Sequence, residues 1–285
     1  MSLGILTNVA ATYAENSLNQ TQNSLQTVLQ QLSSGSRINS GADDAAGLSI
    51  SDGLTANEAA LTQSAQNAQN GVGLLQTADG ALSQVTNLLD RAVTLATEAS
   101  NGGLTTAQST AADTEFQSIL TEIGNIGSTT NFNSTAVFSA TATNFTVSDG
   151  TAAGTTTIAA TVGALTTANV GSGTGVDLSA DTLTGATPAA GQTAAKTALT
   201  DVTNAIADIS AQRGAIGANI NQLNAAANVA SSEEVNLSSA QSAILSTNFG
   251  QATSDLAKYQ VLSQTGISAL AQANSSQQEI LKLLQ

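Results

Sequence analysis

Apolar residues recur at helical spacing through the first part of the chain. Between residues 3 and 32 they stand three or four positions apart at Leu6, Val9 and Tyr13, and then seven, four and three positions apart at Leu18, Leu25, Leu29 and Leu32. This spacing is typical of an amphipathic helix. The positions between them are mostly Asn, Gln, Ser and Thr. The apolar stripe is therefore narrow, as in a helix that packs against partner helices.

The clearest helix is predicted from about residue 43 to residue 100. Its apolar seam steps by three and four through Leu75, Ala78, Leu82, Val85, Leu89, Ala92 and Ala96. Small residues at alternate places allow close approach of a second helix. Gly102 and Gly103 end the helix. A shorter helix over residues 106–126, with Phe116 and Ile123 on one face, is expected to fold back as a helical hairpin.

The middle of the chain, residues 129–191, is rich in Thr, Ala, Gly and Ser. Residues 144–147 and 155–158, separated by Ser148-Asp149-Gly150, predict a β-hairpin. Helical spacing returns from about residue 192, with a seam at Leu199, Val202, Ile206, Ile209, Arg213, Ile216, Ile220, Leu223, Ala227 and Ala230. A buried Arg213 would need a carboxylate partner, but its long stem can also reach the rim of the seam. We expect the rim.

The last segment places Leu256, Tyr259, Leu262, Gly266, Leu270 and Ala273 on one helical face. Helical patterns thus occupy both ends of the chain, and only the centre is β-like. The predicted fold class is mainly α, a long antiparallel helical bundle of paired N- and C-terminal segments with a small β-hairpin region in the middle. Each layer would then be built from discontinuous segments.

A joint, residues 33–47, separates the first two helical patterns. It is rich in Gly, Ser and Asn, which favour turns. Arg37, one of only six basic residues, stands shortly before Asp43 and Asp44. A cation this scarce beside two carboxylates suggests a folded joint in which the charges pair. The alternative is a solvated loop with incidental charges.

Composition narrows the function. Aromatic residues make up 2% of the chain and Trp is absent, which favours long helices packed through Ala and Leu over a thick globular core. The net charge of −14 argues against partners such as nucleic acid or an anionic membrane. No run of 18 apolar residues occurs, so we expect no membrane span. The N-terminus lacks a basic cluster followed by an apolar run, so we expect no cleaved signal peptide.

The chain also lacks the usual groups of catalysis. It has no Cys and no His, so thiolate or imidazole chemistry is excluded, and a Ser nucleophile would have no His base. Asp43-Asp44 and Glu233-Glu234 could bind a divalent cation. Adjacent acids at a helix start more often serve to stabilise the helix, because its N-terminal end carries the positive end of the helix dipole. We expect no enzyme, no metal site and no cofactor.

Two stretches resemble a known family. Residues 32–48, Leu-Ser-Ser-Gly-Ser-Arg-Ile-Asn-Ser-Gly-Ala-Asp-Asp-Ala-Ala-Gly-Leu, are similar to the N-terminal signature of bacterial flagellins. Residues 236–242 and 270–284 resemble the matching C-terminal signatures. The resemblance implies a structural subunit that is exported unfolded through the flagellar type III channel and polymerises outside the cell into the filament that propels swimming. The alternatives are a hook–filament junction protein, or a non-flagellar secreted coiled-coil surface protein.

The resemblance also implies an organisation and a set of partners. An inner-core terminal coiled coil would comprise residues 1–42 and 247–285. An outer-core helical rod with the β-hairpin would comprise residues 43–161 and 192–246, leaving 162–191 as a short surface connector. The partners would be further copies of the chain, the filament cap, hook-junction proteins and an export chaperone.

The resemblance further implies two sets of site residues. Polymerisation is expected to use Leu6, Val9, Tyr13, Leu25, Leu32, Arg37, Asp43, Asp44, Leu256, Tyr259, Leu262 and Leu270, with Arg37 pairing to Asp43 or Asp44 within or between subunits. Arg91, Leu95 and Glu115 match the positions at which flagellins face a host Toll-like receptor. The alternative is that these three serve packing and filament contacts.

Overall fold

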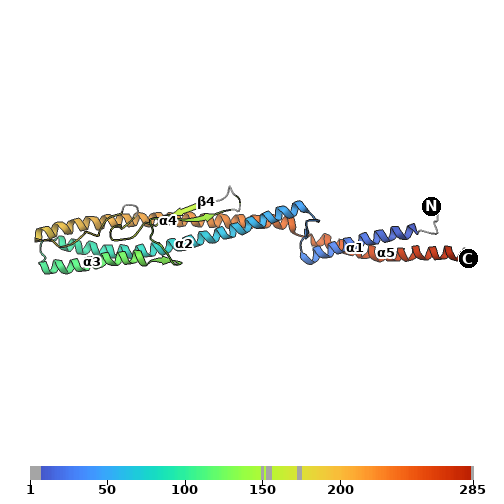
Figure 1. Ribbon diagram of the computed structural model, residues 1–285, viewed down its shortest axis with the longest axis horizontal. Coiled ribbons are helices and arrows are strands. Elements are labelled where there is room, and N and C mark those ends of the chain that lie inside the picture. The colour runs from blue at the N-terminus through green and yellow to red at the C-terminus, as the bar shows by residue number, and fades with distance from the viewer. Residues whose placement is uncertain (1–7, 149–150, 152–155, 172–174, 284–285) are drawn as a thin grey trace. The chain divides into compact units, whose positions relative to one another are not determined.

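The computed structural model describes residues 8–148, 151, 156–171 and 175–283, with the side chains from 280 onward left out. Helices dominate the described chain (Figure 1). They are α1 (Val9–Ser34), α2 (Ala45–Ser100), α3 (Thr106–Thr129), α4 (Pro188–Leu245) and α5 (Phe249–Leu283). The predicted fold class, mainly α with a small β region in the middle, is confirmed.

The chain separates into two compact units. The terminal unit comprises Met1–Ala56 and Asn236–Gln285, and the central unit comprises Asn57–Val235. Both boundaries fall inside helices, one within α2 and one within α4. They differ from the predicted boundaries at 42/43 and 246/247, which had been placed at the turns between helices.

In the terminal unit α1 and α5 lie side by side and antiparallel (Figure 1). Asn8 Nδ2 donates to the Ala273 carbonyl at 3.1 Å at one end, and Thr247 N donates to the Gly35 carbonyl at 3.1 Å at the other. The partly or fully covered residues of α1 include a seam at Ala11, Ala14, Leu18, Thr21, Leu25, Val28 and Leu32. Those of α5 include Ala252, Leu256, Tyr259, Ser263, Gly266, Leu270, Ala273 and Gln277. Steps of three and four make this a short antiparallel coiled coil.

Local signals in the sequence fix both ends of α1. The Asn8 side chain accepts a hydrogen bond from Ala11 N at 3.0 Å, as an N-cap residue does. At the other end Gly35 adopts a left-handed conformation with φ of 72° and donates its N–H to the Gln31 carbonyl. Glycine adopts this conformation without a steric penalty, so the helix stops where the joint begins.

In the central unit the predicted seam of α2 is fully buried. Leu75, Ala78, Leu82, Val85, Leu89, Ala92 and Ala96 each have no exposed surface. They form one core with Phe116, Ile119 and Ile123 of α3 and with the inner face of α4. The turn after α2 leads into a capping box between Thr105 and Gln108, which starts α3. The predicted α2–α3 hairpin is confirmed.

The predicted seam of α4 is confirmed at Val202, Ile209, Ile216, Leu223 and Ala230. It is shifted by one residue, to Ala198, Ala205 and Gln212, where Leu199, Ile206 and Arg213 had been predicted. The buried residues are Gly191, Ala195, Ala198, Val202, Ala205, Ile209, Gln212, Ile216, Leu223 and Ala230. The larger side chains of Ile206 and Ile220 flank this seam and are only partly buried. The Arg213 side chain keeps 36% of its surface exposed and pairs with Asp79 at 2.7 Å, so it lies at the rim as expected. Gln212 stands in the seam instead.

The described strands form two small ribbons. β3 (Thr143–Val147) pairs antiparallel with β4 (Thr156–Ala160), with Phe145 opposite Ile158. The predicted hairpin is confirmed, although residues 149 and 150 of its turn and residue 155 of its predicted second strand lie outside the described residues. A second ribbon, β1 (Asn131–Phe132) with β2 (Thr135–Ala136), was not predicted.

The segment 162–191 packs closely on the helices, whereas the prediction had placed it on the surface. Its apolar side chains Val162, Leu165, Val170, Leu178 and Leu183 are buried in the same core as the α2 seam. The backbone of the segment crosses α3 at Gly127, where a Cβ would collide with the Leu165 carbonyl oxygen. The segment contains few large apolar side chains, but almost all of them are buried in the core.

Candidate functional site

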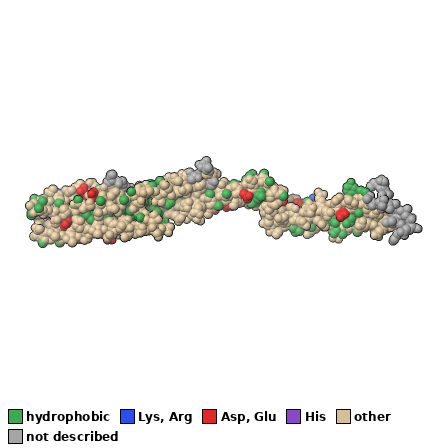
Figure 2. All heavy atoms as spheres, viewed as in Figure 1, with side chains coloured by type: hydrophobic (Ala, Val, Ile, Leu, Met, Phe, Trp, Pro, Cys, Tyr) green, Lys and Arg blue, Asp and Glu red, His purple; other side chains and the backbone are tan. Residues whose placement is uncertain are grey.

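Large apolar side chains remain exposed on the outside of the α1–α5 pair. We call six of them the outer apolar residues: Val9, Tyr13, Leu29, Val261, Leu262 and Ile267. Phe249, the first residue of α5, is also exposed but lies beside Gly35 at the joint. Tyr13 is 72% exposed and Val9 is 58% exposed. Figure 2 shows hydrophobic side chains (green) at the surface of this pair among tan atoms, which are the backbone and the uncharged polar side chains. Water-exposed apolar groups in such a number indicate a surface that other molecules cover.

The predicted polymerisation residues divide between two faces of the pair. Leu25, Leu32, Leu256, Tyr259 and Leu270 lie along the seam, where they are partly covered by the facing helix. Val9, Tyr13 and Leu262 point outward, and Leu6 lies outside the described residues. The sequence had suggested one stripe per helix, but the seam uses Ser263 where the prediction had used its neighbour Leu262.

The α1–α5 pair is nearly neutral in a strongly acidic chain. Its two helices contain three acidic residues, Glu15, Asp255 and Glu279, and two basic ones, Lys258 and Lys282. The whole chain carries a net charge of −14. Two copies of the chain can therefore approach through this pair with little charge repulsion, while the rest of the chain repels its like.

The joint is folded, and Arg37 is part of it. The Arg37 N–H donates to the Leu245 carbonyl at 2.6 Å, and its guanidinium donates to the Ile244 carbonyl at 2.9 Å. The Thr247 N–H donates in turn to the Gly35 carbonyl. These bonds tie the break between α1 and α2 to the break between α4 and α5. The positive charge of Arg37 beside the last carbonyls of α4 also stabilises that helix, because the C-terminal end of a helix dipole is negative.

The predicted pairing of Arg37 with Asp43 or Asp44 is wrong within the described chain, whose salt bridges do not include it. Asp43 instead accepts hydrogen bonds from the N–H groups of Asn39 and Ser40 and from the Ser40 hydroxyl. The bond from the Asn39 N–H contributes most to lowering the pKa of Asp43. Asp44 accepts from the Gly47 N–H at 2.9 Å in the first turn of α2. Both carboxylates thus shape the turn. Pairing between subunits stays a prediction.

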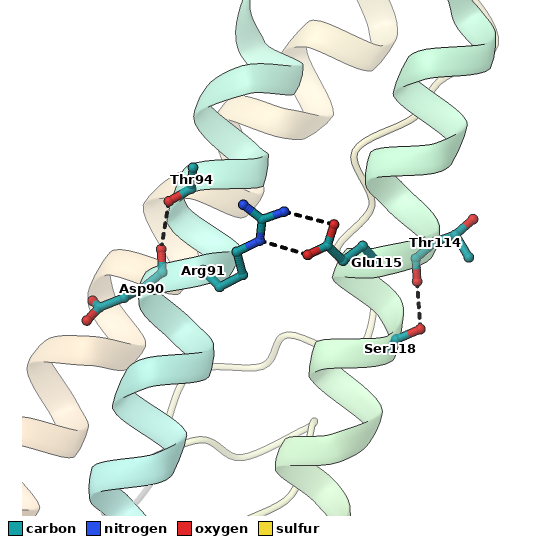
Figure 3. A network of polar contacts seen from close by, with 6 residues as sticks. All are labelled: Asp90, Arg91, Thr94, Thr114, Glu115 and Ser118. Atoms are coloured by element: carbon teal, nitrogen blue, oxygen red, sulfur yellow. Dashed lines mark hydrogen bonds and ion pairs between the residues drawn. The ribbon is translucent and has the colours of Figure 1, made fainter.

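The residues of the predicted receptor patch lie on α2 and α3. Figure 3 shows Arg91 of α2 facing Glu115 of α3 in a two-pronged ion pair, with Nε–Oε1 at 2.7 Å and Nη2–Oε2 at 3.0 Å. Both side chains are about half exposed. The hydrogen bond from Arg91 lowers the pKa of Glu115. Leu95 is 2% exposed, so the prediction that it faces a receptor does not fit its place in the core.

The described residues offer no cluster for metal chemistry. Within them, no three His, Cys, Asp or Glu residues stand close enough to hold a metal ion. Of the helices described, none combines the length and apolar character of a membrane span. The candidate functional features are the outer apolar residues of the α1–α5 pair and the joint.

Both ends of the chain match known family models. The model described as bacterial flagellin N-terminal helical region matches residues 5–143, and that of the C-terminal helical region matches residues 199–284. A flagellin of Listeria innocua is 30% identical over 98% of this chain and 98% of its own length. A flagellin of Halalkalibacterium halodurans is 32% identical over 97% of this chain and 98% of its own. The crystal structure of Bacillus cereus flagellin covers 57% of this chain and 88% of its own, at 28% identity and a TM-score of 0.45.

The chain belongs to the flagellin family. As a flagellin it is a structural subunit of the bacterial flagellar filament, outside the cell, and it assembles with copies of itself. The family match confirms the resemblance seen in the sequence and favours the filament subunit over the two alternatives.

The family matches coincide with the helical parts of this flagellin. The first covers α1, α2 and α3, and the second covers most of α4 and the described part of α5. The unmatched interval, residues 144–198, contains the β3–β4 hairpin and the segment that packs over Gly127.

Proposed function

We propose that this flagellin polymerises through the α1–α5 pair, and that the outer apolar residues are the contacts between subunits. The observation that carries the proposal is the exposure of six large apolar side chains on a nearly neutral pair of helices. Such side chains gain free energy when a second copy removes them from water. The near neutrality of the pair permits dense packing of copies around it.

The magnitudes favour many neighbours over one. Each outer apolar residue is already partly covered, so burying the remainder contributes about 1 kcal/mol per side chain. Six of them contribute about 6 kcal/mol, at the low end of the roughly 4–15 kcal/mol that association of two molecules costs. One such contact holds two copies weakly. A subunit with several neighbours at once is held firmly, which is the situation in a filament.

The proposal keeps the predicted roles of the inner-core and outer-core parts of the chain. Residues 1–42 with 247–285 supply the contacts that hold the filament together, while 43–161 and 192–246, with the packed segment 162–191 between them, form a stable core around the α2 seam. Among the described side chains of α1 only Val28 is buried, so the pair depends on neighbours for stability. Weak internal packing of this kind also supports export in an unfolded form with a chaperone, and later binding to cap and hook-junction proteins.

A second proposal concerns the Arg91–Glu115 pair as a contact for a host innate receptor. Two half-exposed charged groups, held rigidly together by hydrogen bonds, present both a donor and an acceptor to a partner. A receptor-reporter assay with the purified monomer tests this. We expect a signal that falls when Arg91 and Glu115 are both replaced by Ala. No response from the unaltered chain at high dose would refute the proposal.

The main proposal is tested by assembly of the purified full-length chain. We expect salt-precipitated protein to form long filaments in negative-stain electron microscopy. The double variant Val9→Ser with Tyr13→Ser should need a higher protein concentration to do so. A matched control, Thr12→Ser with Gln20→Ser, changes exposed polar residues of the same helix and should assemble normally. Equal assembly of both variants would show that the outer apolar residues are not contacts.

A further inference from the structure

A groove runs along one flank of the α1–α5 pair. It has a volume of about 220 Å³ and is lined by Ser17, Leu18 and Thr21 of α1 and by Leu262, Gly266 and Ala269 of α5. The groove exists because Gly266 has no side chain at the point where Leu18 crosses α5. A Cβ on Gly266 would stand 3.3 Å from Leu18 Cδ1. The small side chains of Ser17 and Ala269 leave the rim open.

The two threonine hydroxyls around the groove already have hydrogen-bond partners. The Thr21 hydroxyl donates to the Ser17 carbonyl at 2.8 Å, and the Thr265 hydroxyl donates to the Val261 carbonyl at 2.8 Å. Both bonds lie within a single helix, so an occupant of the groove has no need to supply a polar partner. With the apolar side chains of Leu18, Leu262 and Ala269 on its walls, the groove fits an apolar side chain.

An exposed apolar side chain stands at the same height on the opposite flank. In the heptad of α5 Ser263 and Gly266 occupy the a and d positions, so Ile267 is at e while Leu262 and Ala269 are at g. Positions e and g lie on opposite sides of a coiled-coil seam. Ile267 is 49% exposed and directly follows Gly266, about 1.5 Å further along the helix axis. The pair therefore has a projection on one flank and a hollow on the other, at one level.

We propose that Ile267 of one subunit inserts into the Leu18–Gly266 groove of a second copy lying parallel beside it. This inference rests on the proposed function and adds the pair of surfaces that meet. The size fits, since an apolar cavity of about 150 Å³ already holds a benzene molecule. The charge also fits, because α1 and α5 together carry only five charged residues of both signs. A projection that meets a hollow elsewhere on the molecule makes an open contact that repeats along a row of copies without closing.

Cysteine pairing tests the contact directly, because the natural chain contains no Cys. One full-length variant carries Ile267→Cys and another carries Ala269→Cys at the exposed rim of the groove. The two are mixed, assembled into filaments and treated with a mild oxidant. We expect a disulfide-linked dimer in the mixture, at least fivefold above its level in filaments of either variant alone.

The control replaces the other exposed apolar residue nearby, with Val261→Cys mixed with Ala269→Cys. Val261 is at the f position, away from the proposed contact, so this mixture should show no enrichment of dimer. Circular dichroism checks that every variant keeps the helicity of the natural chain. Filaments that form normally but show no dimer enrichment for Ile267→Cys with Ala269→Cys would overturn the inference and leave the proposed function standing. Failure of the unaltered chain to form filaments would overturn both.

Discussion

The guanidinium of Arg37 donates a hydrogen bond to the carbonyl oxygen of Ile244, 207 positions later in the chain, at 2.9 Å. The Arg37 N–H donates to the next carbonyl, that of Leu245. Arg37 thus binds the end of α4 to the joint at two successive carbonyls. The terminal helices leave the joint from this point, so their pairing depends on it.

Replacement of Arg37 by Ala should therefore weaken assembly without unfolding the chain. Loss of a cation at a helix C-terminus costs roughly 0.5–1 kcal/mol. We expect the critical concentration for filament formation to rise about two- to fivefold, since 1.4 kcal/mol is a factor of ten. Helicity of the monomer should be unchanged by circular dichroism. Arg37→Lys, which keeps the charge, should recover part of the loss, and an unchanged critical concentration for Arg37→Ala would return the joint to a plain loop.

Gly127 should tolerate no side chain, in contrast to a glycine one turn earlier in α3. A Cβ at Gly127 collides with the Leu165 carbonyl, whereas a Cβ at Gly124 meets Thr167 Cγ2 at an ordinary 3.7 Å. Gly127→Ala should lower the free energy of unfolding by about 1–3 kcal/mol through overpacking. Gly124→Ala should leave it unchanged or raise it by up to about 1 kcal/mol through helix propensity. Denaturant unfolding compares the two, and equal effects would show that the segment does not press on α3.

Asp181 should make the central unit sensitive to pH. Its Oδ2 is buried, and no hydrogen-bond partner is found for it among the described residues. Burial, and to a lesser extent the charges of Asp201 and Asp177, raise the pKa of Asp181 from 3.8 to about 6. The folded chain therefore binds this proton more tightly than the unfolded chain does. The stabilisation from protonated Asp181 is fully present below about pH 4 and is lost as the pH rises through about 6.

The variant Asp181→Asn removes this titration. At pH 7.5 we expect its Tm to exceed that of the natural chain by about 1–3 °C, because a carboxylate in an unfavourable place has been neutralised. At pH 4 the advantage should disappear. Thermal unfolding followed by circular dichroism at both values checks this. Asp177→Asn, at a carboxylate whose pKa is instead lowered by a hydrogen bond from the Ser179 hydroxyl, is the control and should show no such gain.

The sequence predicted the fold where large apolar residues were regularly spaced. Every residue of the predicted α2 seam is fully buried. Its Leu and Val residues follow steps of three and four, so only one face of the helix is apolar enough to be buried. In α4 the larger Ile206 and Ile220 stand beside the smaller Ala205 and Asn219. Both members of each pair fit a helical spacing. The structure buries Ala205 in place of Ile206, whereas Asn219 and Ile220 are both only partly covered.

Other features depend on contacts that no local pattern contains. The nearest opposite charges to Arg37 in the sequence are Asp43 and Asp44, yet its partners are carbonyls at the far end of the chain. The seam of α5 passes through Ser263 and Gly266, and neither residue has a large apolar side chain. Periodicity therefore assigned Leu262 to the inside, and only the facing α1 helix shows that it lies outside.

The central claim is that the terminal helices hold the filament together, and deletion of residues 256–285 tests it most directly. The full chain and the truncated chain are purified, salt-precipitated side by side, and examined by negative-stain electron microscopy and sedimentation. We expect long filaments from the full chain and a soluble monomer with an intact α2–α4 core from the truncated one. Filaments from the truncated chain would contradict the account.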